Sequence, residues 1–509
     1  PTITDSTGVN TSAGSKPRLY YRRSAGPNAD SNAFNDNTPG TAGWKYVEAT
    51  NASSPFSFTT NFALLNGGAG IALTNVVEYF VVAQDTAGTP NVGIYAGSFA
   101  TAPTSVALTA ANFAVTGAPS FTVVAAGLSG TVTIGAAGTY PSLTGATGLF
   151  AAINANGLSG PLTANIVDAS VGETGATALN AINYNGCAAG PYAVTIRPAA
   201  SNVTALTGSV SSGALIKLNG ADSVTIDGSN SGGTDRSLTI TNTSATSPTV
   251  ISVQSLGTGI GATDNTIKNV NISTGSNAAT SYGIWAGSAT TGTAGDDNDN
   301  LTIQNNAISK AYYGIRVDAN ATGLNNNLTI TGNSIGSTTS GSEVLFSGVT
   351  VSQATGASIG GNTIFNLIPT TAVDPAGIAI GTGVVSSTIN GNIIYDISPS
   401  NTGGYGGRGI TVNTGNASSN LTISNNSISN IKGSGWSSFT SDSIAGILIG
   451  NTSSSTGGLK IYYNSVNLGS GSFAGNTSGT LSGAFVVAQS GPTGLDVRNN
   501  VFATNLVNS

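Results

Sequence analysis

LTIQNNAIS, residues 301–309, recurs in recognisable form through the C-terminal half of the chain. Each copy contains a triplet with apolar residues, two spacers, an Asn, one more spacer and another apolar residue. The aligned asparagines are Asn306, Asn333, Asn362, Asn392, Asn426, Asn464 and Asn500. By subtraction they lie 27, 29, 30, 34, 38 and 36 residues apart. A repeat of this length predicts a solenoid or a similar array.

The strand pattern changes phase inside this stretch. Leu301 and Ile303 are two positions apart, so they share one face of an extended strand. Ile308 follows Ile303 by an odd number of positions, yet this position is apolar in every copy. Asn305 and Asn306 lie between them, and asparagine tolerates the left-handed conformation that a sharp bend needs. The stretch therefore predicts a corner between two short strands.

A third strand in each turn begins at a small residue. Its copies are GIWA from Gly283, GIRV from Gly314, GVTV from Gly348, GIAI from Gly377, GITV from Gly409, GILI from Gly446 and the weaker AFVV from Ala484. Three short strands per turn, with inward Ile and Val, predict an all-β right-handed parallel β-helix. Because stacked turns lie about 4.8 Å apart, we expect the aligned asparagines to form a structural amide ladder at the corner.

The remaining chain predicts two further parts. Residues 1–100 contain alternating or apolar runs, such as RLYYRR from Arg18 and WKYVEA from Trp44, between Gly, Pro and Asn clusters. This pattern predicts a small antiparallel β-sandwich. We expect a linker over residues 101–140 and the β-helix over 141–509, with a helix near 142–157 covering the apolar end of its first turn.

Composition excludes several classes of protein. Only 7% of the residues are charged, the net charge is −6, and no basic run is present, so we expect no nucleic-acid partner. The absence of His excludes Ser-His-Asp and Cys-His catalysis, and the lone Cys187 excludes an internal disulfide. No apolar run is long enough to span a membrane, and no signal peptide is visible, so we expect a mature or trimmed form beginning at Pro1.

Two segments carry a resemblance to known families. The run EYFVVAQD from Glu78 resembles a late strand of fibronectin type III or immunoglobulin-like modules. With a TYPSL lead-in from Thr139 and the Asn-cornered turns, the chain resembles large secreted surface proteins of Gram-negative bacteria that use the type IX export pathway. This resemblance implies an extracellular location and O-glycosylation at Asp-Ser/Thr-apolar triplets. The matching hydroxyl residues are Ser6, Thr86, Ser223 and Ser443.

A polysaccharide-degrading or carbohydrate-binding protein is the alternative, because parallel β-helices include pectate lyases and polygalacturonases. Such hydrolases need two or three carboxylates on one outer face. Stacking of the Gly-started strands brings only Trp285, Arg316 and Asp318 together, with Arg316 expected against Trp285. This patch is consistent with a sugar-stacking platform or with an ordinary surface cation–π contact, which we favour.

The run GDDNDN contains the acidic residues Asp296, Asp297 and Asp299. Oxygen ligands suit calcium, but the spacing matches neither an EF-hand loop nor a nonapeptide calcium repeat. We therefore expect a solvated loop and no cofactor, with calcium as the alternative.

The sequence favours a non-enzymatic extracellular surface protein, an adhesin or a filament component. Low charge, abundant Asn, Ser and Thr, and a repeat with an attached sandwich module support this. Residues 495–509 form a repeat element with no helix or charged strand after it, which predicts end-to-end association into a fibre. The expected partners are further copies, other surface proteins or glycans.

Overall fold

A computed structural model describes residues 1–124, 126–184, 190–277, 280–434, 443–450, 455–473, 481–489 and 491–508. The chain divides into two compact units, Pro1–Ala125 and Ala126–Ser509. Among the described residues, the only α-helix is α1 (Leu149–Asn156), and η1 (Phe62–Leu64) and η2 (Ala110–Asn112) are short 3₁₀ helices. The other regular elements are strands, so the predicted all-β class is confirmed.

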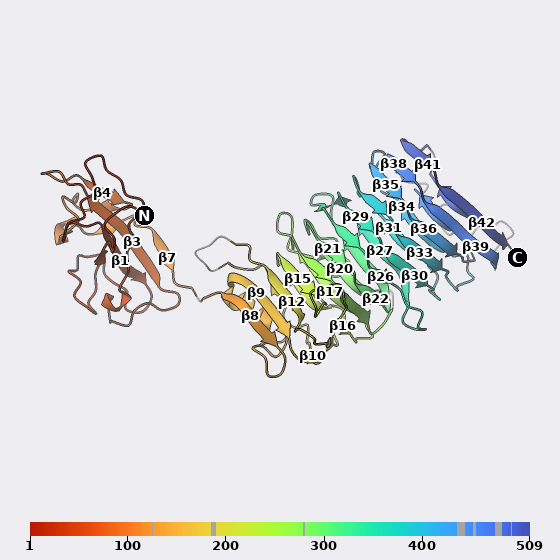
Figure 1. Ribbon diagram of the computed structural model, residues 1–509, viewed down its shortest axis with the longest axis horizontal. Coiled ribbons are helices and arrows are strands. Elements are labelled where there is room, and N and C mark those ends of the chain that lie inside the picture. The colour runs from red at the N-terminus through yellow and green to blue at the C-terminus, as the bar shows by residue number, and fades with distance from the viewer. Residues whose placement is uncertain are drawn as a thin grey trace. The chain divides into compact units, whose positions relative to one another are not determined.

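The second unit is a parallel β-solenoid built from three long sheets (Figure 1). In order along the stack, the first sheet contains β8 (Leu128–Ile134), β9 (Leu158–Ile166), β12 (Val194–Pro198), β15 (Val224–Asp227), β18 (Thr266–Lys268), β21 (Thr302–Gln304), β25 (Thr329–Thr331), β29 (Ser358–Gly360), β32 (Thr388–Asn390), β35 (Leu421–Ser424), β38 (Leu459–Tyr462) and β41 (Leu495–Arg498). The second contains β10 (Ser170–Gly172), β13 (Thr204–Gly208), β16 (Leu238–Asn242), β19 (Val270–Thr274), β22 (Ala307–Ser309), β26 (Ser334–Ile335), β30 (Thr363–Leu367), β33 (Ile393–Ile397), β36 (Ser427–Ile431), β39 (Ser465–Phe473) and β42 (Val501–Asn508).

The third sheet contains β11 (Leu179–Asn180), β14 (Ala214–Asn219), β17 (Thr249–Ser255), β20 (Tyr282–Ser288), β23 (Ala311–Asp318), β27 (Val344–Ser352), β31 (Ala376–Ile380), β34 (Arg408–Val412), β37 (Ile444–Ile449) and β40 (Ser482–Val487). A short pair, β24 (Asn325–Asn326) and β28 (Ala354–Thr355), lies outside these sheets. Each complete turn therefore contributes one strand to each long sheet, as three strands per turn predicted.

The core is formed by columns of identical side chains from successive turns. Ile303 lies in register between Ile267 and Ile330, and all three are fully buried. Ile308 is buried in the second sheet, so both isoleucines of the repeat face inward. The phase change between them occurs at Asn305, whose φ is +51°. This confirms the predicted corner and assigns the left-handed residue to the position before the aligned asparagine.

The Gly-started strands have a steric cause. A Cβ added to Gly314 would lie 2.6 Å from the carbonyl oxygen of Gly348 in the next turn and 2.6 Å from a methyl carbon of Ile335. A side chain at position 314 would clash with both of these atoms, so only glycine lets the third sheet lie this close to the second.

Helix α1 covers the first turn with Leu149, Phe150 and Ile153, which are all buried. It is shorter than the predicted 142–157. Residues 142–148 are instead a turn held by the buried Glu173 carboxylate, which accepts the Leu143 and Thr144 N–H groups at 2.8 and 2.7 Å. These bonds compete with helical ones, so the helix begins later.

The first unit contains an antiparallel sheet in the order β2 (Lys45–Glu48), β1 (Arg18–Ala25), β3 (Val76–Gln84) and β4 (Val92–Tyr95), with β7 (Ser120–Thr122) also paired to β3. A separate antiparallel pair joins β5 (Ser98–Phe99) to β6 (Val115–Thr116). Tyr20, Trp44 and Phe80 bury one face of the sheet. The immunoglobulin-like identity of this unit stays a prediction.

The boundary between the units differs from the expected linker at 101–140. β7 returns to pair with β3 in the first unit, whereas β8 is already the first strand of the first solenoid sheet. Short strands with mixed Ala, Thr and Pro content lack the hydrophobic alternation that would have separated them from a linker. No helix among the described residues has the length and hydropathy to cross a membrane.

Candidate functional site

The aligned asparagines form a continuous column of amides, which are buried except for the half-buried Asn500. Asn362 Nδ2 donates to Asn392 Oδ1 (2.9 Å) and to the Ile330 carbonyl oxygen of the preceding turn (2.9 Å). Its backbone N–H donates to the same Asn392 Oδ1 (3.0 Å). Equivalent amide-to-amide bonds of 2.9–3.0 Å join each neighbouring pair from Asn306 to Asn500. Each side chain thus satisfies buried backbone groups in two turns, which is a structural task.

A shorter asparagine pair escaped the sequence analysis. Asn298 and Asn325 each lie three residues before an LTI triplet, at Leu301 and Leu328. The Asn298 N–H donates to Asn325 Oδ1 (2.9 Å), and Asn298 Oδ1 accepts from the Ala262 N–H (3.0 Å). The constant spacing before the triplet was the available signal. This pair closes the loops that lead into the first sheet.

The predicted sugar-stacking patch is brought together, but it is closed. Arg316 lies over Trp285 with its guanidinium carbon 5.6 Å from the ring centroid, and its Nε pairs with Asp318 at 2.7 Å. Trp285 is fully buried and Asp318 is 8% exposed. The chain turns back after β20, where Trp285 Nε1 donates to the Ser288 carbonyl oxygen (3.4 Å). A ring covered in this way offers no open face to a sugar, whereas the cation–π contact favoured from the sequence is present, with the ring buried.

The acidic run at 296–299 is bound to its own protein. Asp296 accepts from Asn320 Nδ2 (2.7 Å) and from the Thr258 hydroxyl, and Asp297 accepts from the Gly259 N–H (2.6 Å). Asp299 accepts the backbone and side-chain N–H groups of Asn326 at 2.7 and 2.9 Å. Within the described ranges, no three Asp, Glu, His or Cys side chains converge as metal ligands. The calcium alternative therefore finds no assembled ligand set there.

Three carboxylates of the solenoid line one hollow, and two of them, Asp222 and Asp299, come from equivalent positions of different turns. A cavity of about 420 Å³ has Asp222, Asp297 and Asp299 in its wall, together with Leu256 and Ile260. Asp222 lies before β15 and Asp299 before β21, with β18 between these strands, so the two aspartates are two turns apart. At ~4.8 Å per turn this places their backbones roughly 10 Å apart. The sequence analysis missed the pair because it compared only the Gly-started strands.

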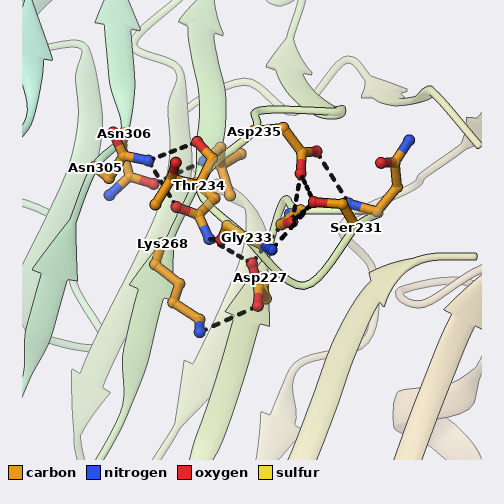
Figure 2. A network of polar contacts seen from close by, with 12 residues as sticks. Asp227, Ser231, Gly233, Thr234, Asp235, Lys268, Asn305 and Asn306 are labelled. Atoms are coloured by element: carbon orange, nitrogen blue, oxygen red, sulfur yellow. Dashed lines mark hydrogen bonds and ion pairs between the residues drawn. The ribbon is translucent and has the colours of Figure 1, made fainter. Parts of the chain in front are cut away.

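A polar network lies over the corners that follow β15, β18 and β21 of the first sheet (Figure 2). Asp227 pairs with Lys268 Nζ at 3.1 Å and accepts from Asn269 Nδ2 at 2.7 Å. Asn305 Nδ2 donates to Asn269 Oδ1 (2.7 Å) and to the Thr234 carbonyl oxygen (2.9 Å). The loop formed by residues 228–237 is thereby fastened across two successive corners.

Asp235 organises the same loop. Its carboxylate accepts from the hydroxyls of Ser229 and Ser237 at 2.6 Å each and from that of Ser231. The Ser229 hydroxyl, followed by those of Ser231 and Ser237, holds the pKa of Asp235 well below its ordinary value. An acid that stays ionised and fully bonded is unsuited to proton transfer near neutral pH. The network is therefore a fold device.

The N-terminal unit contains a hollow of about 630 Å³ with an aromatic lining. Tyr21, Val77 and Tyr79 form its floor on one face of β1 and β3. Tyr95 and Phe121 line it from β4 and β7, and their side chains are 60% and 45% exposed. Sequence patterns do not reveal this feature, because its residues come from six separate segments.

The four glycosylation candidates differ in accessibility. Ser6 and Thr86 are exposed, although the Thr86 hydroxyl donates to the Thr7 carbonyl oxygen (2.7 Å). Ser223 is half-buried and has a φ of +58°. Ser443 is fully buried, and residue 442 of its triplet lies outside the described residues. A buried hydroxyl cannot receive a glycan in the folded chain, which excludes Ser443 there and leaves Ser6 and Thr86 as the exposed candidates.

No protein-family model and no curated protein matches the chain. The solved structures that match include a GH136 lacto-N-biosidase from Eubacterium ramulus, with 10% identity, a TM-score of 0.38, and coverage of 74% of this chain and 67% of that one. The catalytic domain of a GH87 alpha-1,3-glucanase has 13% identity, a TM-score of 0.34, and coverage of 99% and 90%. The Streptococcus pneumoniae surface protein and adhesin PfbA has 11% identity, a TM-score of 0.26, and coverage of 70% and 95%. These similarities are too distant to transfer a function.

Proposed function

We propose that this chain is an extracellular structural or adhesive protein whose solenoid is a rigid, non-enzymatic scaffold. The supporting observation is the buried amide column that runs through seven consecutive turns. The asparagine side chains at that corner hydrogen-bond to backbone groups and to each other. Arg316 contacts both Trp285 and Asp318, so the residues considered for sugar binding are bonded to one another. Side chains used in this way provide stiffness and leave recognition to other surfaces.

Location and activity test this proposal separately. Antibodies raised against the chain should label intact cells of the organism that carries it, and the purified chain should release no reducing ends from neutral or acidic polysaccharides. Labelling only after permeabilisation would contradict the extracellular role. Turnover of a polysaccharide would contradict the non-enzymatic one.

Polysaccharide hydrolysis is the second candidate, and the hollow lined by Asp222 and Asp299 favours it. Inverting glycosidases hold their two carboxyl groups about 6.5–9.5 Å apart, so that a water molecule fits beside the sugar ring. A backbone separation of roughly 10 Å allows such a spacing. The apolar Leu256 and Ile260, 45% and 57% exposed, would contact the sugar at the same hollow.

Paired variants test this second candidate. Asp299→Asn should abolish any polysaccharide turnover, whereas Asp264→Asn should preserve it, since Asp264 is exposed close by without lining the hollow. Turnover that survives in Asp299→Asn would exclude the pair.

End-to-end association stays a prediction. Val501 and Phe502 of β42 are 63% and 37% exposed, so a second copy could bury apolar surface there. Sedimentation velocity should show concentration-dependent assembly that Val501→Lys reduces. A wild-type chain that stays monomeric at every concentration would exclude the fibre.

A further inference from the structure

We propose that the hollow in the N-terminal unit binds an uncharged saccharide by stacking its ring on aromatic side chains. This inference goes beyond the proposed function, because it holds whether or not the chain is displayed on a cell. It concerns residues 1–124, all of which the structure describes.

The hollow has the volume and the aromatic lining of a site for a small ligand. Its volume of about 630 Å³ lies within the ~300–1,000 Å³ typical of sites for small ligands. Phe56, Phe58 and Phe62 line it beside the tyrosines of its floor. Tyr21 and Phe62 contact each other edge to face at 5.7 Å, which fixes both rings. Rings that are already held in place lose little side-chain entropy when a ligand packs against them.

The charged side chains near the hollow are bonded elsewhere. No side chain that lines it is charged, and Pro1 is the one lining residue with a charged group, its α-amino group. Residues one position along each strand face the opposite side of the sheet, where Arg22 pairs with Glu78 at 2.7 Å. Arg23 shares the face of the hollow, opposite Val77, but it is 3% exposed and donates to three backbone carbonyl oxygens. A charged ligand would find no free side-chain partner in the hollow, which favours a neutral one.

The exposure of the rim selects a ligand with one apolar face and one polar edge. Tyr95 and Phe121 keep 60% and 45% of their surface in water, and Phe121 lies 6.2 Å from Tyr79. An acyl chain resting there would leave much of its length hydrated, so it would gain little from burial of its CH₂ groups. A sugar ring places its C–H face on the aromatic rings and leaves its hydroxyl groups to water and to Thr60, which also lines the hollow.

Calorimetric titration of the full chain with neutral oligosaccharides, after selection on a glycan array, tests the inference. We expect saturable binding, a loss of at least about tenfold in affinity in Tyr95→Ala and in Phe121→Ala, and the same affinity at low and high salt because no ion pair forms. The matched control is Tyr463→Ala, which removes a tyrosine of 58% exposure from the solenoid and should leave binding unchanged.

Both rim side chains are exposed, so their removal should not unfold the unit, and circular dichroism should confirm this. Three results would overturn the inference: no neutral saccharide binds, binding is unaffected by both rim variants, or only charged saccharides, acyl chains or apolar peptides bind.

Discussion

Replacement of Asn392 by alanine should destabilise the solenoid strongly, because this amide is fully buried in the middle of the column. Its Oδ1 accepts from the backbone N–H and the Nδ2 of Asn362 at 3.0 and 2.9 Å. Its Nδ2 donates to Asn426 Oδ1 at 2.9 Å and to the Ile359 carbonyl oxygen at 3.0 Å. Alanine removes all four bonds, and the Asn362 N–H loses the acceptor it has in the column.

The expected loss follows from these four bonds. An orphaned buried N–H costs ~1–3 kcal/mol, and each of three further lost bonds contributes ~0.5–1.5 kcal/mol, so the free energy of unfolding should fall by roughly 2.5–7.5 kcal/mol. Asn392→Asp should lower the free energy of unfolding by a similar amount, since a carboxylate cannot donate to Asn426 Oδ1 or to the Ile359 carbonyl oxygen.

Asn390→Ala is the matched control. Asn390 lies in the same turn, and its Oδ1 also accepts two side-chain bonds, from Ser424 Oγ (3.0 Å) and Asn425 Nδ2 (2.9 Å). Because Asn390 is exposed, water replaces these bonds, and the loss should stay below about 1 kcal/mol. Urea denaturation followed by far-ultraviolet circular dichroism measures both changes, and hydrogen exchange at the Asn362 amide should accelerate only in Asn392→Ala. Equal midpoint shifts in the two variants would refute the structural role of the column.

Three further outcomes are expected. Tyr463 has a φ of +56° at the corner position that Gly332, Gly361 and Gly391 occupy in other turns, so Tyr463→Gly should raise the unfolding free energy by about 1 kcal/mol, and an unchanged or lower urea midpoint would count against this. Burial raises the pKa of Glu173, so its contribution to stability is present below its pKa in the unfolded chain and is lost as pH rises through its pKa in the folded chain. Glu173→Gln should therefore remove the decline in melting temperature with rising pH. Identical pH profiles of the melting temperature in the two proteins would show the reasoning to be wrong. Added calcium should leave the melting temperature unchanged, because the carboxylates of the 296–299 run are bound to Thr258, Gly259 and Asn326; a clear rise would reveal a site.

The sequence alone determined the solenoid, because its information is local and repeated. The odd spacing of Ile303 and Ile308 required a corner, and the corner required a residue that tolerates a left-handed backbone, found as Asn305. The alignment of asparagines at one position of every turn was sufficient to expect the amide column, since parallel turns stack equivalent residues at a constant distance.

Only the tertiary structure decided what each outward residue contacts. Trp285 was correctly placed beside Arg316, but the ring is also buried, in contact with Tyr282 and the Ser288 carbonyl oxygen, and strand alternation contains no information about these contacts. Asp222 and Asp299 are stacked two turns apart by the repeat, but the hollow that they line also needs Leu256 and Ile260 from the loop after β17. The aromatic hollow likewise combines segments as distant as Tyr21 and Phe121. A repeated pattern of neighbouring residues is enough to predict the backbone of the solenoid. A binding surface forms where segments remote in the sequence meet, and the loops that bring them together do not repeat, so no sequence period predicts it.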